Sequence, residues 1–185
     1  MSSTNRGSKR VQNDFYETPS WCVEAILPHL PLGGSVLDPC AGKGAILRAC
    51  AKSFDSRMAI EINEDFEHEL QQVVTGEFDL TIDDAGAINY WPKADVVLMN
   101  PPFSKAEQFV RMALSEQRPY QGITCALLRL PFLASKKRAD FLRANPPDVY
   151  VLSKRPSFNG IGTDSCDYAW FVWGPGRGGR WVVLP

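Results

Sequence analysis

Histidine is scarce in this chain, and long hydrophobic runs are absent. The 185 residues include two histidines, His29 and His68, so the usual ligand spacing of a zinc site is missing. The five cysteines are well separated and form no C-x-x-C pair, which is typical of reduced thiols rather than of a disulfide framework. No segment approaches about 18 consecutive apolar residues, so we expect neither a membrane span nor a secretory signal. These absences predict a cytoplasmic location.

Neither sign of charge dominates, because the chain has 20 lysines and arginines and 21 aspartates and glutamates. The charges are nevertheless unevenly placed: residues 53–89 carry a net charge of −9 and residues 129–155 a net charge of +5. A basic segment can hold the phosphates of a nucleic acid, and Lys136, Lys137 and Arg138 form its densest part. The same three residues could equally form a solvated helix face, and both interpretations remain open.

Short apolar segments alternate with helical patterns along most of the chain. The predicted strands cover residues 35–39, 57–61, 78–82, 94–99, 122–130, 149–153 and 168–173, with a final short strand at 181–184. The first helix is expected from Pro19, with Thr18 as its N-cap, and Ser104 is expected to cap a later one. This alternation is typical of an α/β fold with a mostly parallel, seven-stranded sheet and helices on both faces. We expect a flexible tail over residues 1–13 and one domain over residues 14–185.

Ligands bind such sheets at the carboxyl ends of the strands, so the residues that follow each strand are the candidates for a site. The first strand leads into a glycine loop, Asp38–Gly44, in which Gly42 and Gly44 allow a ligand to approach the backbone closely. The loop matches neither the dinucleotide fingerprint nor a P-loop. Glu61 ends the second strand 19 residues after Gly42, close to the offset at which an acid accepts hydrogen bonds from ribose hydroxyls.

Two acids follow the third predicted strand. A carboxylate of Asp83 or Asp84 could accept a hydrogen bond from an adenine amino group, and Asp84 is the better candidate because it directly precedes Ala85. The choice between the two adjacent acids stays open.

The most specific signal is Asn100-Pro101-Pro102-Phe103, which ends the fourth strand. Two prolines fix the backbone and remove two amide donors, so the Pro101 carbonyl can point outward as an acceptor. The Asn100 side-chain oxygen is a second acceptor, and Phe103 offers a flat apolar surface. Two acceptors and a ring match a planar substrate that carries an NH₂ group. A similar segment, residues 145–148, follows a helix instead of a strand, and we interpret it as a helix stop that leads into the sixth strand.

With these features in place, the chain resembles the class I S-adenosylmethionine-dependent methyltransferases. More narrowly, it is similar to the small adenine-N6 DNA methyltransferases often carried by phages and mobile elements. Residues 38–44 resemble the family's first motif, and residues 100–103 resemble its catalytic motif for amino-group methylation. Residues 15–21 resemble the motif that closes over the methionine end of the cofactor. Residues 154–160 resemble a late motif whose aromatic residue, here Phe158, packs on the flipped base, although Phe158 could equally belong to the core.

The resemblance implies a single Rossmann-like methyltransferase domain that transfers a methyl group from S-adenosyl-L-methionine to the N6 amine of adenine in DNA. The implied cofactor-binding residues are Tyr16, Thr18, Asp38, Pro39, Ala41, Gly42, Gly44, Glu61, Ile62, Asp84, Ala85 and Asn100. The implied catalytic residues are Asn100, Pro101, Pro102 and Phe103, and the implied substrate-binding residues are Phe103, Phe158, Lys136, Lys137 and Arg138. It further implies no metal, a monomer or small homo-oligomer, and a role such as restriction-modification in a bacterial or phage-infected cell.

The chain departs from the family in size, because it leaves no room for a separate target-recognition domain. Sequence specificity is then either weak or located in short loops such as residues 132–138 and 157–167. DNA is the favoured acceptor. In similar enzymes the same corner also serves methylation of RNA adenine at N6 and of protein glutamine at N5. Cytosine-N4 transfer is a further alternative, but it usually has serine in place of Asn100. A further alternative is a nucleic-acid-binding or anti-restriction protein that has lost catalysis. The intact Gly42 and Glu61 argue against this alternative.

Overall fold

Eight strands form one sheet in the order β3-β2-β1-β4-β5-β7-β6-β8 in the computed structural model, which describes residues 17–75, 78–79, 91–158 and 162–185. The strands are β1 (Ser35–Asp38), β2 (Ser56–Ile60), β3 (Phe78–Asp79), β4 (Val96–Met99), β5 (Ile123–Arg129), β6 (Asp148–Leu152), β7 (Tyr168–Trp173) and β8 (Trp181–Leu184). All neighbouring pairs are parallel except the two that β7 makes with β5 and β6. The predicted α/β fold with a mostly parallel sheet is confirmed, and the final short strand extends that sheet as β8.

Short helices connect the strands. The α-helices are α1 (Ser20–Ile26), α2 (Ala45–Ala49), α3 (Glu67–Gln71), α4 (Ala106–Gln117) and α5 (Ala139–Ala144). Tighter 3-10 turns are η2 (Leu27–His29), η3 (Glu64–Phe66), η4 (Arg118–Tyr120), η5 (Leu130–Phe132) and η6 (Lys136–Arg138). Within the described ranges, none of the helices combines the length and the apolar character that a bilayer span requires.

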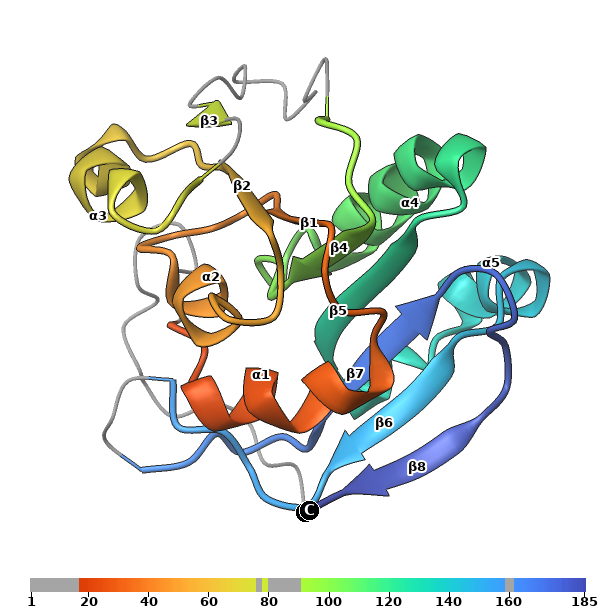
Figure 1. Ribbon diagram of the computed structural model, residues 1–185. Helices are drawn as coiled ribbons and strands as arrows, with labels where there is room; N and C mark the ends of the chain where they lie inside the picture. The colour runs from red at the N-terminus through yellow and green to blue at the C-terminus, as the bar shows by residue number, and fades with distance from the viewer. Residues whose placement is uncertain (1–16, 76–77, 80–90, 159–161) are drawn as a thin grey trace.

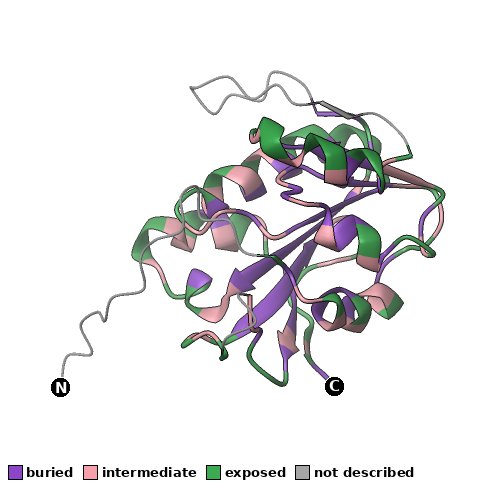
Figure 2. Cartoon of the chain, turned by 90° about the vertical axis from the view of Figure 1, so that its left-hand side faces the viewer, coloured by how far each residue is buried: buried purple, intermediate pink, exposed green. Residues whose placement is uncertain are grey.

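Alternate residues of the strands enter two separate cores, one on each face of the sheet. In β4, Val96 and Leu98 pack with residues of α1, α2 and α3, whereas Val97 and Met99 pack with residues of α4 and α5. Figure 1 shows α1 crossing in front of the strands. In Figure 2 the central strands are almost wholly buried and lie between helices whose outer sides are exposed, whereas β8 at the edge of the sheet is partly exposed. Helices therefore cover both faces, which explains why the strands read as continuous apolar runs.

Two helix starts differ from the sequence-based expectation. Helix α1 begins at Ser20 with Pro19 in the N-cap position, and no side chain caps it. Thr18 is not the N-cap, because its hydroxyl oxygen accepts a hydrogen bond from the Asn100 side chain instead. Helix α4 begins at Ala106 with Lys105, not Ser104, in the N-cap position. In contrast, α5 ends at Ala144 and β6 begins at Asp148, so the second Asn-Pro-Pro segment is a helix stop as predicted.

Strand β7 runs between β5 and β6 and is buried along its whole length. Its Trp170 indole donates a hydrogen bond of 2.7 Å from Nε1 to the Cys22 carbonyl in α1. This bond fixes α1 against the sheet, and with it the residues that precede α1. The carboxyl ends of β1, β2, β4 and β5 meet at one edge, because these strands are parallel neighbours. The candidate site lies at that edge.

Candidate active site

The Glu61 carboxylate closes the glycine loop that follows β1. Its Oε2 accepts a hydrogen bond of 2.6 Å from the Gly42 amide, and its Oε1 accepts bonds of 2.9 Å from the amides of Ile62 and Asn63. Glu61 is only 7% exposed. Gly42 and Gly44 have φ angles of +52° and +80°, the left-handed region that glycine adopts without strain. The structure thus brings together the loop and the acid that the sequence identified separately.

A second buried carboxylate, that of Asp38, lies in the same loop. Its Oδ1 accepts a hydrogen bond of 3.2 Å from the Cys40 amide. Burial, together with the nearby charge of Glu61 and against the hydrogen bonds from Cys40, raises the pKa of Asp38 to about 7. Among the described residues, neither Asp38 nor Glu61 forms an ion pair. The loop is therefore an acidic environment that would favour a positively charged ligand.

Three other predicted loop residues surround these acids. Pro39 and Ala41 are buried, and the Ala41 amide donates a hydrogen bond of 3.1 Å to the Ile60 carbonyl at the end of β2. Ile62, by contrast, is 45% exposed. A Cβ atom added to Gly44 would lie 2.7 Å from the Val73 side chain, so Gly44 is needed for packing in addition to its backbone conformation.

The proline corner, residues 100–103, follows β4 and lies beside the glycine loop. The Asn100 side chain donates a hydrogen bond of 3.0 Å from Nδ2 to the Thr18 hydroxyl oxygen. The Asn100 backbone also lies near the Cys40 thiol of the loop, whose pKa it lowers against the larger effect of burial. Pro101 is buried, and the Pro102 carbonyl accepts a bond of 2.9 Å from the Lys105 amide. Loop, corner and the segment before α1 therefore meet around Asn100.

An aromatic cluster adjoins this corner. The Phe103 ring centroid lies 6.5 Å from that of Phe158 and 6.2 Å from that of Tyr168, and Phe158 and Tyr168 are 5.1 Å apart. Phe103 and Phe158 are both partly exposed and pack against the core on the α1 face. The structure thus brings Phe158 next to Phe103 and packs it against the core, and its role on a flipped base stays a prediction.

The residues expected to hold phosphates differ in their surroundings. Lys136 and Lys137 are exposed on η6. The Arg138 guanidinium is bound within the protein: Nε donates to the Phe132 carbonyl at 2.8 Å, and Nη1 lies 3.8 Å from Glu107 in the first turn of α4. The η6 segment therefore lies beside the start of α4, a few residues beyond Phe103, with its two lysines facing solvent.

Sequence reasoning placed Arg129 in the basic segment but missed its contact with Phe103, and it did not identify Asp164 or Tyr168 individually. The Arg129 guanidinium lies over the Phe103 ring and hydrogen-bonds both other residues. Arg129 ends β5, so the strand-end rule could have identified it, whereas nothing local pointed to Asp164. Tyr16, Asp84 and Ala85 lie outside the described residues.

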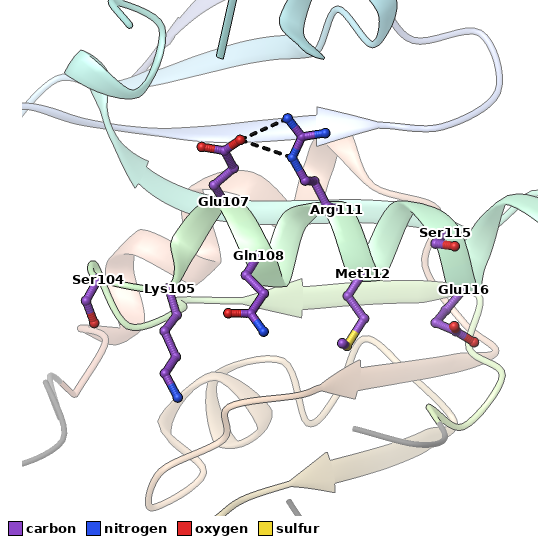
Figure 3. A pocket seen from close by; sticks show the side chains of 8 residues that line it. All are labelled: Ser104, Lys105, Glu107, Gln108, Arg111, Met112, Ser115 and Glu116. Carbon is purple, nitrogen blue, oxygen red and sulfur yellow. Dashed lines mark hydrogen bonds and ion pairs between the residues drawn. The ribbon is translucent and has the colours of Figure 1, made fainter. Parts of the chain in front are cut away.

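A hollow of about 690 Å³ lies along the outer side of α4, and none of the residues predicted to form the site lines it. Figure 3 shows Lys105, Gln108 and Met112 on one side of the helix and the Glu107–Arg111 ion pair on the other. Its remaining lining residues are Ser104, Ser115 and Glu116. Among the residues described, no group of three or more histidine, cysteine, aspartate or glutamate side chains could hold a metal ion.

Comparison of the sequence with models of protein families and with curated proteins finds no match. Solved structures are nevertheless similar. A candidate RNA methyltransferase from Pyrococcus horikoshii has a TM-score of 0.65 at 16% identity, over 93% of this chain and 94% of that one. A class I S-adenosylmethionine-dependent methyltransferase candidate from Listeria monocytogenes has a TM-score of 0.61 at 12% identity, over 94% of this chain and 66% of that one. A dimethyladenosine transferase from Plasmodium falciparum has a TM-score of 0.59 at 16% identity, over 87% of this chain and 62% of that one.

At these identities the likeness concerns the fold. It spans nearly the full length of both chains in the first comparison. The chain therefore has the fold of the class I methyltransferases.

Proposed function

We propose that this chain transfers a methyl group from S-adenosyl-L-methionine to the N6 amine of adenine in nucleic acid, with DNA as the acceptor that the sequence favours. The observation that carries the proposal is the position of the proline corner. Asn100 is hydrogen-bonded to Thr18, and its backbone lies near Cys40 of the glycine loop, so a ligand in the loop and an acceptor at Phe103 would lie next to each other.

The residues of the loop fit the proposed cofactor. S-adenosylmethionine carries a sulfonium and an ammonium group, and the buried Asp38 and Glu61 have no cationic partner among the described residues. A positive ligand would relieve the cost of burying these carboxylates. Under this proposal Glu61 also accepts hydrogen bonds from the ribose, as its offset from Gly42 predicts. When bound, the cofactor would supply the methyl group from its sulfonium.

The corner fits a planar amine. The N6 nitrogen of adenine is a poor nucleophile because its lone pair is delocalised into the ring. Acceptance of its protons by Asn100 Oδ1 and the Pro101 carbonyl would favour tetrahedral geometry and stabilise the positive charge that develops in the transition state. Stacking of the base on Phe103 would contribute about 1–3 kcal/mol. In duplex DNA the adenine must first leave the stack, which costs a few kcal/mol.

RNA is the second candidate acceptor. Two of the similar structures are described as an RNA methyltransferase candidate and a dimethyladenosine transferase, which supports adenine in RNA as much as in DNA. An unpaired RNA target would also avoid the cost of base flipping. Protein glutamine-N5 transfer and a catalytically dead nucleic-acid-binding protein remain outcomes of the test.

The test is incubation of the full chain with methyl-labelled cofactor and, separately, DNA, RNA and a protein mixture, followed by nucleoside analysis. We expect N6-methyladenine in DNA, and N6-methyladenine in RNA would assign the second candidate. The variant Asn100→Ala is expected to lose transfer while cofactor binding, measured by calorimetry, stays nearly intact. Normal transfer by that variant would disprove the role of the corner, and nucleic-acid binding without methylation would identify a dead fold.

A further inference from the structure

Arg129, the last residue of β5, holds a fixed position against the Phe103 ring. Its guanidinium carbon Cζ lies over the ring, 3.9 Å from the ring centroid, which is a cation–π contact. Its Nε donates a hydrogen bond of 2.9 Å to the Tyr168 hydroxyl, and its Nη2 donates one of 3.2 Å to Asp164 Oδ2. The Tyr168 hydroxyl donates to the same Oδ2 at 2.9 Å. Two polar anchors therefore hold the guanidinium while it covers the ring.

The Asp164 anchor is itself well held. Its carboxylate is 15% exposed, and its Oδ1 accepts a hydrogen bond of 2.9 Å from the Cys166 amide. Burial opposes ionisation, but the hydrogen bonds from Cys166 and Tyr168 and the charge of Arg129 hold the pKa of Asp164 below its ordinary value. The Asp164 amide also donates to the Pro156 carbonyl at 2.9 Å, two residues before Phe158. The network thus connects the segment that carries Phe158 with the arginine that contacts Phe103.

These contacts argue against a phosphate-binding role for Arg129. A phosphate-binding arginine presents its donors to the nucleic acid, whereas Arg129 directs Nε and Nη2 to Tyr168 and Asp164. Its charge is also paired with the Asp164 carboxylate at 3.2 Å. The Nη1 donors remain on a side chain that is 39% exposed, but the planar group also makes a close contact with Phe103.

We infer that Arg129 is a positioning residue, which fixes the plane of the Phe103 ring and thereby the plane in which the acceptor base stacks. The inference rests on the proposed function, because it concerns the ring on which the acceptor is proposed to lie. While Arg129 keeps its two bonds, a base that stacks on Phe103 does so on the face that the guanidinium does not cover. Asp164 and Tyr168 act through Arg129.

Arginine is required for this arrangement. A guanidinium is planar and presents its donors in a rigid fork, so it can stack and bond two acceptors at once. A lysine ammonium keeps the charge but is not planar. Arg129→Lys and Arg129→Met should therefore behave alike, which distinguishes positioning from a simple need for positive charge.

The experiment measures methyl transfer by the full chain to an adenine-containing oligonucleotide that the wild type methylates. For Arg129→Lys and Arg129→Met we expect kcat/KM for the oligonucleotide to fall about tenfold or more, in line with a weakened base–ring stack. The dissociation constant of the cofactor should stay within about twofold. Adding Tyr168→Phe to Arg129→Met should cause little further loss, because residues that act through one contact are not additive. An oligonucleotide with 2-aminopurine at the target position should show less stacking-induced quenching in the variants.

Arg111→Met is the matched control. Arg111 lies 4.1 Å from the Phe141 ring and bonds Glu107 at 2.9 and 3.0 Å, so it is the same kind of stacked, ion-paired arginine on α4. We expect wild-type kinetics from it. If Arg129→Met does not fold, Asp164→Asn, which loses one anchor without a change of size, is expected to give a severalfold fall.

Wild-type kinetics and quenching in both Arg129 variants would overturn the positioning role while the proposed function stands. Equal weakening of cofactor binding and transfer would likewise overturn it, in favour of a general structural role. Failure of the wild type to methylate any DNA, RNA or protein acceptor would overturn the proposed function and the positioning role with it.

Discussion

Asn100 and Thr18 are joined by a hydrogen bond of 3.0 Å from the Asn100 amide nitrogen to the Thr18 hydroxyl oxygen, although 82 residues separate them in the chain. In this orientation the amide nitrogen donates to the hydroxyl, and the amide oxygen, which can only accept, is not used by Thr18. With the nitrogen directed to Thr18, the oxygen is directed elsewhere, and under the proposed function it accepts a proton of the acceptor amine.

Thr18→Val should therefore reduce methyl transfer. The substitution keeps the branched shape of the side chain but removes the oxygen that orients Asn100, and one such bond is worth about 1 kcal/mol. We expect a fall in kcat of severalfold to about tenfold in single-turnover assays, with Thr18→Ser close to the wild type. Equal rates for the valine and serine variants would show that the hydrogen bond does not orient the catalytic amide.

Glu61→Ala should weaken both the fold and cofactor binding. It leaves the amides of Gly42, Ile62 and Asn63 without their acceptor, and each unsatisfied buried group costs about 1–3 kcal/mol. We expect a clear decrease in the free energy of unfolding in urea and a severalfold or larger increase in the cofactor dissociation constant by calorimetry. Unchanged cofactor binding would remove the ribose assignment, even if stability falls.

Asp38 should make the stability of the ligand-free protein fall as pH rises. An unfolded aspartate titrates near pH 4, whereas burial raises the pKa of Asp38 to about 7 in the folded protein. Between these values the folded protein holds a proton that the unfolded chain has lost, so its stability decreases from about pH 4 to about pH 7. Asp38→Asn should flatten that part of a urea-unfolding series, and an unchanged slope would contradict the shifted pKa.

The same carboxyl should couple cofactor binding to proton release. A positively charged ligand favours the ionised form of Asp38, so binding should tighten as pH rises toward 7 and should release protons below that pH. Calorimetry at about pH 6 in two buffers of different ionisation enthalpy measures this release. Asp38→Asn should abolish it.

Lys136 and Lys137 should affect affinity for nucleic acid without affecting the fold. Both are exposed, and each phosphate contact contributes about 0.7–0.9 to the slope of log affinity against log salt. Replacement of both lysines by glutamine should raise KM for the oligonucleotide and reduce that slope by between about one and two. Arg138→Gln should instead lower stability, because its guanidinium bonds the Phe132 carbonyl. An unchanged salt slope in the double variant would exclude phosphate binding by this segment.

The sequence predicts the fold and part of the site because both depend on local patterns. Alternating strands and helices predict a parallel sheet, and such a sheet places Asp38, Glu61 and Asn100 at one edge. This placement can be predicted before any of their contacts is known. The bond between Gly42 and Glu61 across 19 residues follows from that topology.

The contacts that the sequence does not predict join residues far apart in the chain. Thr18 looks like a helix cap, yet its hydroxyl serves Asn100. Arg129 looks like part of a basic segment, yet its partners Asp164 and Tyr168 lie 35 and 39 residues away. Serine, threonine and arginine side chains have many possible partners, and the tertiary arrangement decides among them.

The antiparallel position of β7 has a consequence for how the chain is made. Strands β5 and β6 each need β7 as a neighbour, so during synthesis both expose unpaired backbone edges until residue 173 has left the ribosome. Such edges are templates for aggregation. A nascent chain released before Tyr168 would also lack an anchor of Arg129, so the ring at the corner would be the last part of the site to become ordered.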